Sequence, residues 1–175
     1  KAVRGAEISL DSLNMPRLAS FTDEEIAAQL NQCDDQRLFV VFEALKRGIT
    51  CEAIHDITQI DLWFLNKLNH LVRLERQMAE ELTDELYREA KKRGYPDKVI
   101  ERLSGQKITR PLQAVYKMVD TCAAEFAAET PYFYSTFDDE NEAANFISEN
   151  RTGKKTVIVF GSGPIRIGQG IEFDY

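Results

Sequence analysis

Four glycines lie close together in the sequence and could form a turn that contacts a phosphate: Gly161, Gly163, Gly168 and Gly170. They follow residues 156–160 (T-V-I-V-F), an apolar, β-branched run typical of a buried strand. A strand that leads into a glycine-rich turn begins a nucleotide-binding domain. However, Arg166 replaces the third glycine of the dinucleotide fingerprint, and Gln169 and Gly170 replace the Lys and Ser/Thr of a P-loop. Spacing alone leaves open a tight structural turn and a ligand-contacting loop.

A second candidate for chemistry is Cys122, which follows Asp120 and Thr121. A cysteine nucleophile needs an activating base, and no histidine lies near it in the sequence, so we interpret Cys122 as buried and inert. Lys117, Asp120 and Glu125 form the most polar cluster of this region. We favour a structural ion-pair corner over catalysis, and we predict no catalytic residue in the chain.

The remaining polar residues do not have the spacing of a metal site. His55 and His70 are fifteen positions apart and no Cys-x-x-Cys pair is present, so no zinc site is predicted. The acidic residues after the second strand-like segment are interpreted as a solvated face; they are Asp138, Asp139, Glu140 and Glu142. Cys33, Cys51 and Cys122 are widely spaced and odd in number, which is typical of a reducing compartment and predicts a cytoplasmic location.

Composition excludes several classes of partner. The 175 residues carry a net charge of −7, which gives no electrostatic reason to bind nucleic acid. No apolar run approaches the length of a membrane span, so no membrane partner is predicted. The apolar fraction of 43% is sufficient for a hydrophobic core. One domain, or one domain and part of another, is expected from this length.

The first two thirds of the sequence predict a series of short, capped helices. Thr22 and Glu25 form a capping box, and Asp34 and Asp35 are expected to open the next helix. That helix has a stripe at helical spacing and ends at Arg47-Gly48; the stripe is Leu38, Val41, Phe42 and Leu45. Thr50 is expected to cap a helix over residues 51–57. Helices that each carry one apolar stripe must pack together, which predicts an all-α bundle over residues 1–110.

The longest predicted helix covers residues 60–82, with Phe64, Leu68, Leu71, Val72 and Leu82 in its apolar stripe. Glu75 falls inside this stripe, so it either reaches solvent or has a buried partner. Trp63, Phe64 and Leu65 are adjacent and cannot all face one core, because neighbouring residues point about 100° apart on a helix. One of them is expected to face a partner, unless the helix is buried on several sides.

Two further helices and a change of pattern complete the chain. Thr83 is expected to start one helix that ends at Arg93-Gly94, and Pro96 another that ends at Ser104-Gly105. After Pro111, residues 115–119 and 132–136 are strand-like, and residues 137–150 are expected to begin as a helix. We place a domain boundary near residues 150–153 (N-R-T-G).

Five segments together resemble the large subunit of carbamoyl-phosphate synthase. The glycine segment, G-S-G-P-I-R-I-G-Q-G-I-E-F-D-Y, is similar to the start of the second synthetase half of that family. Four upstream blocks agree in order: residues 57–65 (I-T-Q-I-D-L-W-F-L), 71–75 (L-V-R-L-E), 115–126 (V-Y-K-M-V-D-T-C-A-A-E-F) and 132–136 (Y-F-Y-S-T). Residues 104–114 are shorter than the family pattern, and residues 138–150 are only loosely related.

The resemblance implies a mainly α fold: a helical oligomerisation domain over residues 1–150, followed over 151–175 by the first strand and glycine loop of an α/β pre-ATP-grasp domain. The chain is then expected to be a fragment of an ATP-dependent ligase that makes carbamoyl phosphate from bicarbonate, ammonia and two ATP with Mg (or Mn). Its implied partners are a second copy, the ATP-grasp halves of the same chain and a glutaminase small subunit. The pathway served would be arginine or pyrimidine biosynthesis.

The same resemblance suggests site residues. Gly170 and Glu172 would line the internal carbamate tunnel, with Arg166 nearby, although an exposed loop carboxylate without a role remains the alternative for Glu172. Trp63, Phe64 and Leu65 are the candidates for the oligomer interface. The fragment itself is expected to bind no cofactor and to be inactive. The alternative for the chain as a whole is a truncated, free-standing nucleotide-binding enzyme.

Overall fold

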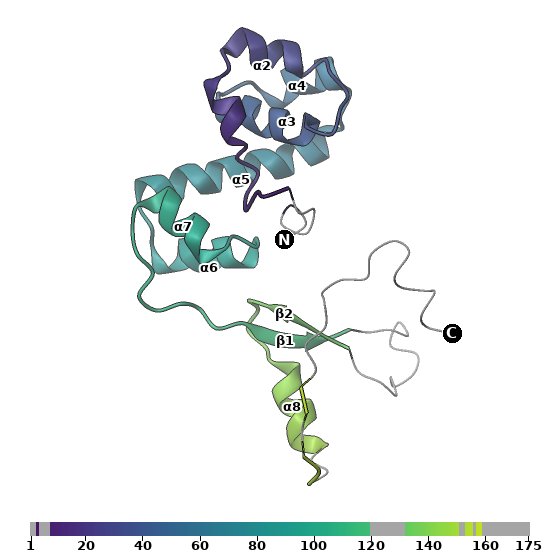
Figure 1. Cartoon of the computed structure of the whole chain (residues 1–175), viewed down its shortest axis with the longest axis vertical. Helices are drawn as coiled ribbons and strands as arrows, with labels where there is room; N and C mark the ends of the chain where they lie inside the picture. Colours follow the sequence, from purple (N-terminus) through teal and green to yellow (C-terminus); the bar gives the residue numbers. More distant parts are fainter. Residues whose placement is uncertain (1–2, 4–7, 120–131, 151–152, 156, 159–175) are drawn as a thin grey trace, which may run out of the picture.

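The computed structural model describes residue 3 and residues 8–119, 132–150, 153–155 and 157–158. Within these residues the chain is mainly helical and carries one small sheet (Figure 1). The elements are η1 (Pro16–Ser20), α2 (Asp23–Gln29), α3 (Arg37–Lys46), α4 (Cys51–Thr58), α5 (Leu62–Glu80), α6 (Asp84–Lys92), α7 (Asp97–Ser104), β1 (Val115–Met118), β2 (Phe133–Thr136) and α8 (Glu142–Glu149). The predicted succession of helices and then strands is confirmed, and described residues up to 110 contain no strand.

Local capping explains most helix starts. Thr22 and Glu25 make the predicted capping box of α2, and the Thr50 and Thr83 side chains cap α4 and α6. The predicted start of α3 is wrong by a few residues, because the Asp34 carboxylate accepts a hydrogen bond from the Gln36 amide (2.9 Å) and stabilises a turn before the helix.

The larger hydrophobic core lies between α2, α3, α4 and the first half of α5. Helix α3 contributes more side chains than its predicted stripe, since Phe39 and Val40 are buried together with Phe42. Leu38 was expected in this core but is 45% exposed, because the buried faces of α3 lie on the other sides of the helix. Helix α3 is therefore buried on several sides, because it lies at the centre of the helices that form the larger core.

The second core lies between the second half of α5 and helices α6 and α7. Its buried members are Leu74, Met78, Ala90 and Ile100. Figure 1 shows α2, α3 and α4 packed at one end of α5, and α6 and α7 at the other. Helix α5 thus connects the two cores, which places residues of its two ends in different surroundings.

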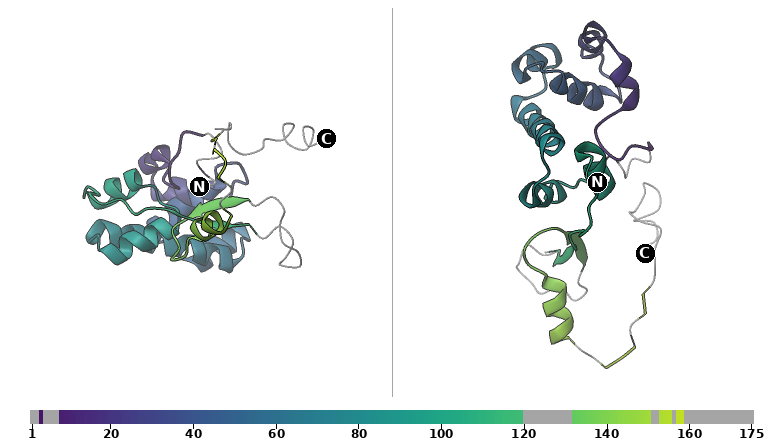
Figure 2. Two further views of the ribbon diagram at one scale, coloured as in Figure 1. Left: turned by 90° about the horizontal axis from the view of Figure 1, so that it is seen from below. Right: turned by 90° about the vertical axis from the view of Figure 1, so that its left-hand side faces the viewer.

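Strands β1 and β2 pair antiparallel, with Val115 opposite Thr136 and Met118 opposite Phe133, so both strand predictions are confirmed. Helix α8 packs on β1 and begins at Glu142, later than the predicted start at residue 137. Figure 2 shows the hairpin and α8 extending away from the helical bundle. Within the part of the chain that the structure describes, no helix is long and apolar enough to cross a membrane.

Candidate interaction site

Several sequence candidates lie outside the described residues: Gly161, Gly163, Arg166, Gly168, Gly170, Glu172, Asp120, Cys122 and Glu125. Lys117 of their cluster is described, and its Nζ lies 3.6 Å from the Glu140 carboxylate. The partner of Lys117 thus comes from the segment between β2 and α8, a contact that was not predicted from the sequence.

The described residues contain no group of three or more His, Cys, Asp or Glu side chains that could hold a metal. The His55 ring donates through Nδ1 to the Ile60 carbonyl (2.7 Å), which fixes the turn between α4 and α5. His70 lies 3.9 Å from Glu89 on α6. The two histidines therefore have separate structural surroundings. Burial raises the pKa of the Cys51 thiol, so this cysteine is a poor nucleophile.

The most conspicuous surface feature is an aromatic pair at the start of α5. Trp63 is 60% exposed and Phe64 is 57% exposed, and their rings meet edge to face with centroids 4.9 Å apart. Leu65 is fully buried, so the structure removes it from the three interface candidates. Phe64 was also predicted to lie in the buried apolar stripe, but its side chain is exposed. The buried side of this helical turn carries Leu65 instead.

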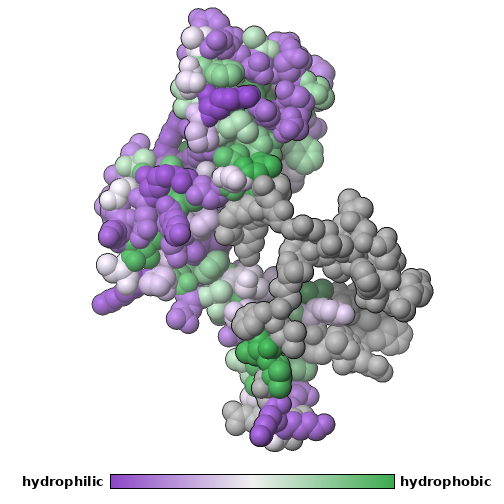
Figure 3. All heavy atoms as spheres, in the orientation of Figure 1, coloured by the Kyte–Doolittle hydropathy of each residue, from purple (hydrophilic) through white to green (hydrophobic). Residues whose placement is uncertain are grey.

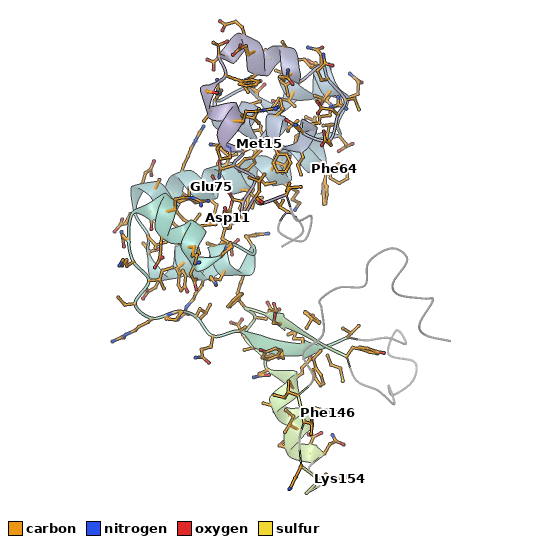
Figure 4. All side chains as sticks on the ribbon, in the orientation of Figure 1. Asp11, Met15, Phe64, Glu75, Phe146 and Lys154 are labelled. Carbon is orange, nitrogen blue, oxygen red and sulfur yellow. The ribbon has the colours of Figure 1, made fainter. Side chains whose placement is uncertain are left out.

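The backbone before the pair is well ordered by local bonds. Gln59 ends α4 in the left-handed conformation (φ 57°), and the Asp61 carboxylate accepts a hydrogen bond from the Trp63 amide (2.7 Å). The aromatic side chains thus project from a capped helix start, where few conformations remain to be lost on binding. Figure 4 shows Phe64 near this end of α5, with Glu75 farther along the helix.

Basic side chains lie beside Trp63 of the aromatic pair. The Lys67 ammonium lies 5.1 Å from the centroid of the Trp63 ring, within the range of a cation–π contact. A groove of about 590 Å³ runs beside it, lined by Trp63, Asn66, Lys67, His70, Leu71, Arg73 and Arg93. Aromatic and arginine side chains are enriched at the centres of protein interfaces. We refer to these residues and Phe64 as the α5 surface.

Glu75 is buried and has part-buried hydrogen-bond partners, which is one of the two alternatives that its place in the stripe left open. Its carboxylate, only 6% exposed, accepts hydrogen bonds from Asn14 Nδ2 (3.2 and 3.0 Å) and from the Tyr95 hydroxyl (3.0 Å). Asn14 in turn accepts from Lys46 Nζ through Oδ1 (2.7 Å). The network ties the segment before η1 to α3, to α5 and to the turn before α7. Burial next to the Glu75 carboxylate raises the pKa of the Tyr95 phenol, which stays protonated and donating.

An ion pair at the surface extends this network. Both terminal nitrogens of Arg102 donate to the Asp11 carboxylate (3.0 and 2.8 Å), a bidentate geometry. The hydrogen bonds from Arg102 lower the pKa of Asp11 below its usual value of 3.8. The residues from Asp11 to Asn14 are thus held to α7 and α5 by side-chain bonds.

We expect Asp11→Asn to lower the free energy of unfolding by less than about 1 kcal/mol at neutral pH, since both partners are largely exposed. A depressed pKa in the folded state means that the contribution is present above the unfolded pKa and is lost as pH falls through the folded pKa. The difference between wild type and variant should therefore shrink below about pH 4. Urea unfolding across a pH series measures it, and a difference that persists at low pH would contradict the assignment.

Helix α6 joins the hairpin to the bundle. The Tyr87 hydroxyl accepts a hydrogen bond from the Leu112 amide (3.0 Å) and donates one to the Asp97 carboxylate (3.0 Å). The buried Lys91 ammonium pairs with Asp97 (2.8 Å) and lies 4.6 Å from the centre of the Phe137 ring. One face of α6 therefore holds the segments on both sides of the hairpin.

A cleft of about 820 Å³ lies beside this joint, between α6 and the segment that follows β2. Its charged lining includes Arg88 and Lys92 from the helix and Asp138 and Asp139 from the segment. Lys92 lies 3.8 Å from Asp139, so opposite charges already meet across the cleft. This mixed lining offers no cradle for an anion such as a nucleotide phosphate.

Comparisons with known proteins find sequences similar to this chain. Residues 1–119 match the family model described as the carbamoyl-phosphate synthetase large chain oligomerisation domain, and residues 153–175 match the carbamoyl phosphate synthase preATP-grasp domain. The chain is 49% identical over its whole length to the carbamoyl phosphate synthase large chains of Agathobacter rectalis and Lachnoclostridium phytofermentans. It spans 17% of the length of each of these relatives.

Proposed function

The chain belongs to the carbamoyl-phosphate synthetase large chain family, and from this membership we propose that it works as the helical self-association module of a synthetase that makes carbamoyl phosphate. The exposed Trp63–Phe64 pair carries the proposal. Two adjacent aromatic rings on a capped helix start form a surface that a second copy would bury.

The geometry of the α5 surface supports this role. A stable interface buries about 1,200–2,000 Å² in total, and its energy comes mainly from a few aromatic and arginine side chains near its centre. The α5 surface provides two aromatic rings with basic side chains beside them. Sedimentation velocity of the chain over a concentration series tests the proposal. A reversible shift towards a dimer is expected, and a single monomeric species at all concentrations would contradict it.

The rest of the family assignment is a proposal about the whole protein. We place the helical module over residues 1–150 and the start of the pre-ATP-grasp domain over 151–175, with Gly170 and Glu172 as tunnel-lining residues. In the whole protein, ATP, Mg or Mn and a glutaminase small subunit would act with the ATP-grasp halves. The whole chain matches only 17% of the length of a longer relative, which argues against the alternative of a free-standing nucleotide-binding enzyme.

We predict that the 175-residue chain shows no saturable binding of Mg-ATP. Gln169 and Gly170 stand where a P-loop carries the Lys and Ser/Thr that hold the phosphates and the metal. Isothermal titration measures the binding directly, with a full-length relative as the positive control. A micromolar dissociation constant for the chain would mean that the glycine segment binds nucleotide by itself.

A further inference from the structure

The hairpin has an outer edge, on β1, that is not paired with a further strand among the described residues. Val119 donates its amide to the Tyr132 carbonyl (2.8 Å), and Lys117 lies opposite Tyr134 in the same register. Amides alternate in direction along an antiparallel strand, so those of Tyr116 and Met118 point away from β2. No other strand of the described chain pairs with this outer edge of β1.

Side chains from the start of α8 occupy both of these outward amides. The Tyr116 amide donates to Asn141 Oδ1 (3.4 Å), and the Met118 amide donates to Glu142 Oε2 (2.6 Å). The second bond is short and has a charged acceptor, which makes it the stronger of the two. Two acceptors thus take the positions that carbonyls of a neighbouring strand would otherwise fill.

The Asn141 side chain bonds to the Tyr116 amide of β1 and does not cap its own helix. It is the N-cap residue of α8, and asparagine at this position normally accepts a hydrogen bond from the first turn of its own helix. Its side chain makes no such capping bond here. Helix α8 packs against β1, which brings Asn141 and Glu142 to the strand edge.

The edge is otherwise suited to pairing with another chain. Tyr116 and Met118 are 48% and 42% exposed, and Tyr134 on the neighbouring strand is 48% exposed. Exposed edges with apolar side chains are sites of intermolecular strand pairing, and proteins protect them with charged groups. Figure 3 shows a hydrophobic patch on the face of the molecule in the region of α8, with hydrophilic residues beyond it at the lower end of the chain.

We propose that Asn141 and Glu142 form an edge guard, which prevents β1 from pairing with β1 of a second copy. The second copy is the relevant partner because a strand can pair antiparallel with its own equivalent about a two-fold axis. The Glu142 carboxylate opposes such pairing in two ways: it occupies the Met118 amide, and it would meet a second Glu142 near the axis. The guard limits association to surfaces other than the hairpin.

The test uses Asn141→Ala/Glu142→Ala in the full 175-residue chain that also carries Trp63→Ala/Phe64→Ala, so that the α5 surface does not contribute. Glu149→Ala, at the exposed end of α8, is the matched control. Sedimentation velocity should show the coefficient of the guard variant rising with concentration, whereas the control stays constant. A guard variant that sediments like the control, with unchanged circular dichroism, would overturn the proposal.

A rescue variant separates strand pairing from simple loss of the hairpin fold. Met118→Pro is added to the guard variant, because its amide points away from β2 and proline removes no bond of the β1–β2 ladder. If the copies pair through β1, proline should abolish the association. Association that persists with proline at position 118 would show that it arises from unfolding of the hairpin, and would contradict the edge guard.

Discussion

Replacing Glu75 with alanine should lower the free energy of unfolding by about 2–4 kcal/mol. The substitution removes the acceptor of three hydrogen-bond contacts and leaves the Asn14 amide and the Tyr95 hydroxyl without their partner in a part-buried site. The cost is large because an unpaired polar group inside a protein loses its water without compensation. Urea unfolding followed by circular dichroism at neutral pH measures the change.

Two further variants show whether the loss comes from the network. Tyr95→Phe removes only one donor, so it should cost about 1 kcal/mol. Glu80→Ala, at the exposed end of the same helix, should change stability by less than about 0.5 kcal/mol. Equal losses for Glu75→Ala and Glu80→Ala would mean that removing any carboxylate from α5 has this cost, and that the buried contacts do not cause it.

The second large effect concerns association. Trp63→Ala/Phe64→Ala should weaken self-association by at least about 2 kcal/mol, which is roughly a 30-fold rise in the dissociation constant. The two rings supply most of the apolar area that the α5 surface can bury. Both side chains are exposed in the single chain, so the free energy of unfolding of the monomer should change little.

Ile147→Ala provides the matched control for this experiment. Ile147 is 62% exposed, about as much as Trp63, and it lies on α8 away from the α5 surface. Sedimentation equilibrium should give the wild-type dissociation constant for this variant. A comparable loss in both variants would show that exposed apolar side chains in general, and not the α5 surface, drive the association.

The starts of α2, α4 and α6 were predictable from sequence because their causes are local. Thr22, Thr50 and Thr83 each cap a helix through an amide three residues ahead. The two strands of the hairpin were also predictable, since short runs with β-branched and aromatic residues form them. The exact start of α8 was not, because Asn141 bonds to β1 and not to its own helix.

The networks could not be predicted, since they join residues far apart in the sequence. The place of Glu75 in an apolar stripe left open either a route to solvent or a buried partner. Its partner Asn14 is 61 positions away, and no pattern in the sequence indicated this contact. The phase of α5 was equally ambiguous: sequence spacing placed Phe64 in the core, whereas packing against α3 and α4 buries Leu65 in the larger core. Such choices depend on tertiary packing, which a stripe of apolar residues specifies only approximately.

The most direct test of the self-association role is photo-cross-linking from position 64. A benzophenone side chain in place of Phe64 preserves an aromatic ring at the α5 surface, and a reducing agent prevents disulfides through the exposed Cys33. Irradiation should give an adduct of twice the 20.0 kDa chain mass, in a yield that rises with concentration and far exceeds that from position 147. Absence of the adduct at concentrations where the chain sediments as a dimer would contradict the account.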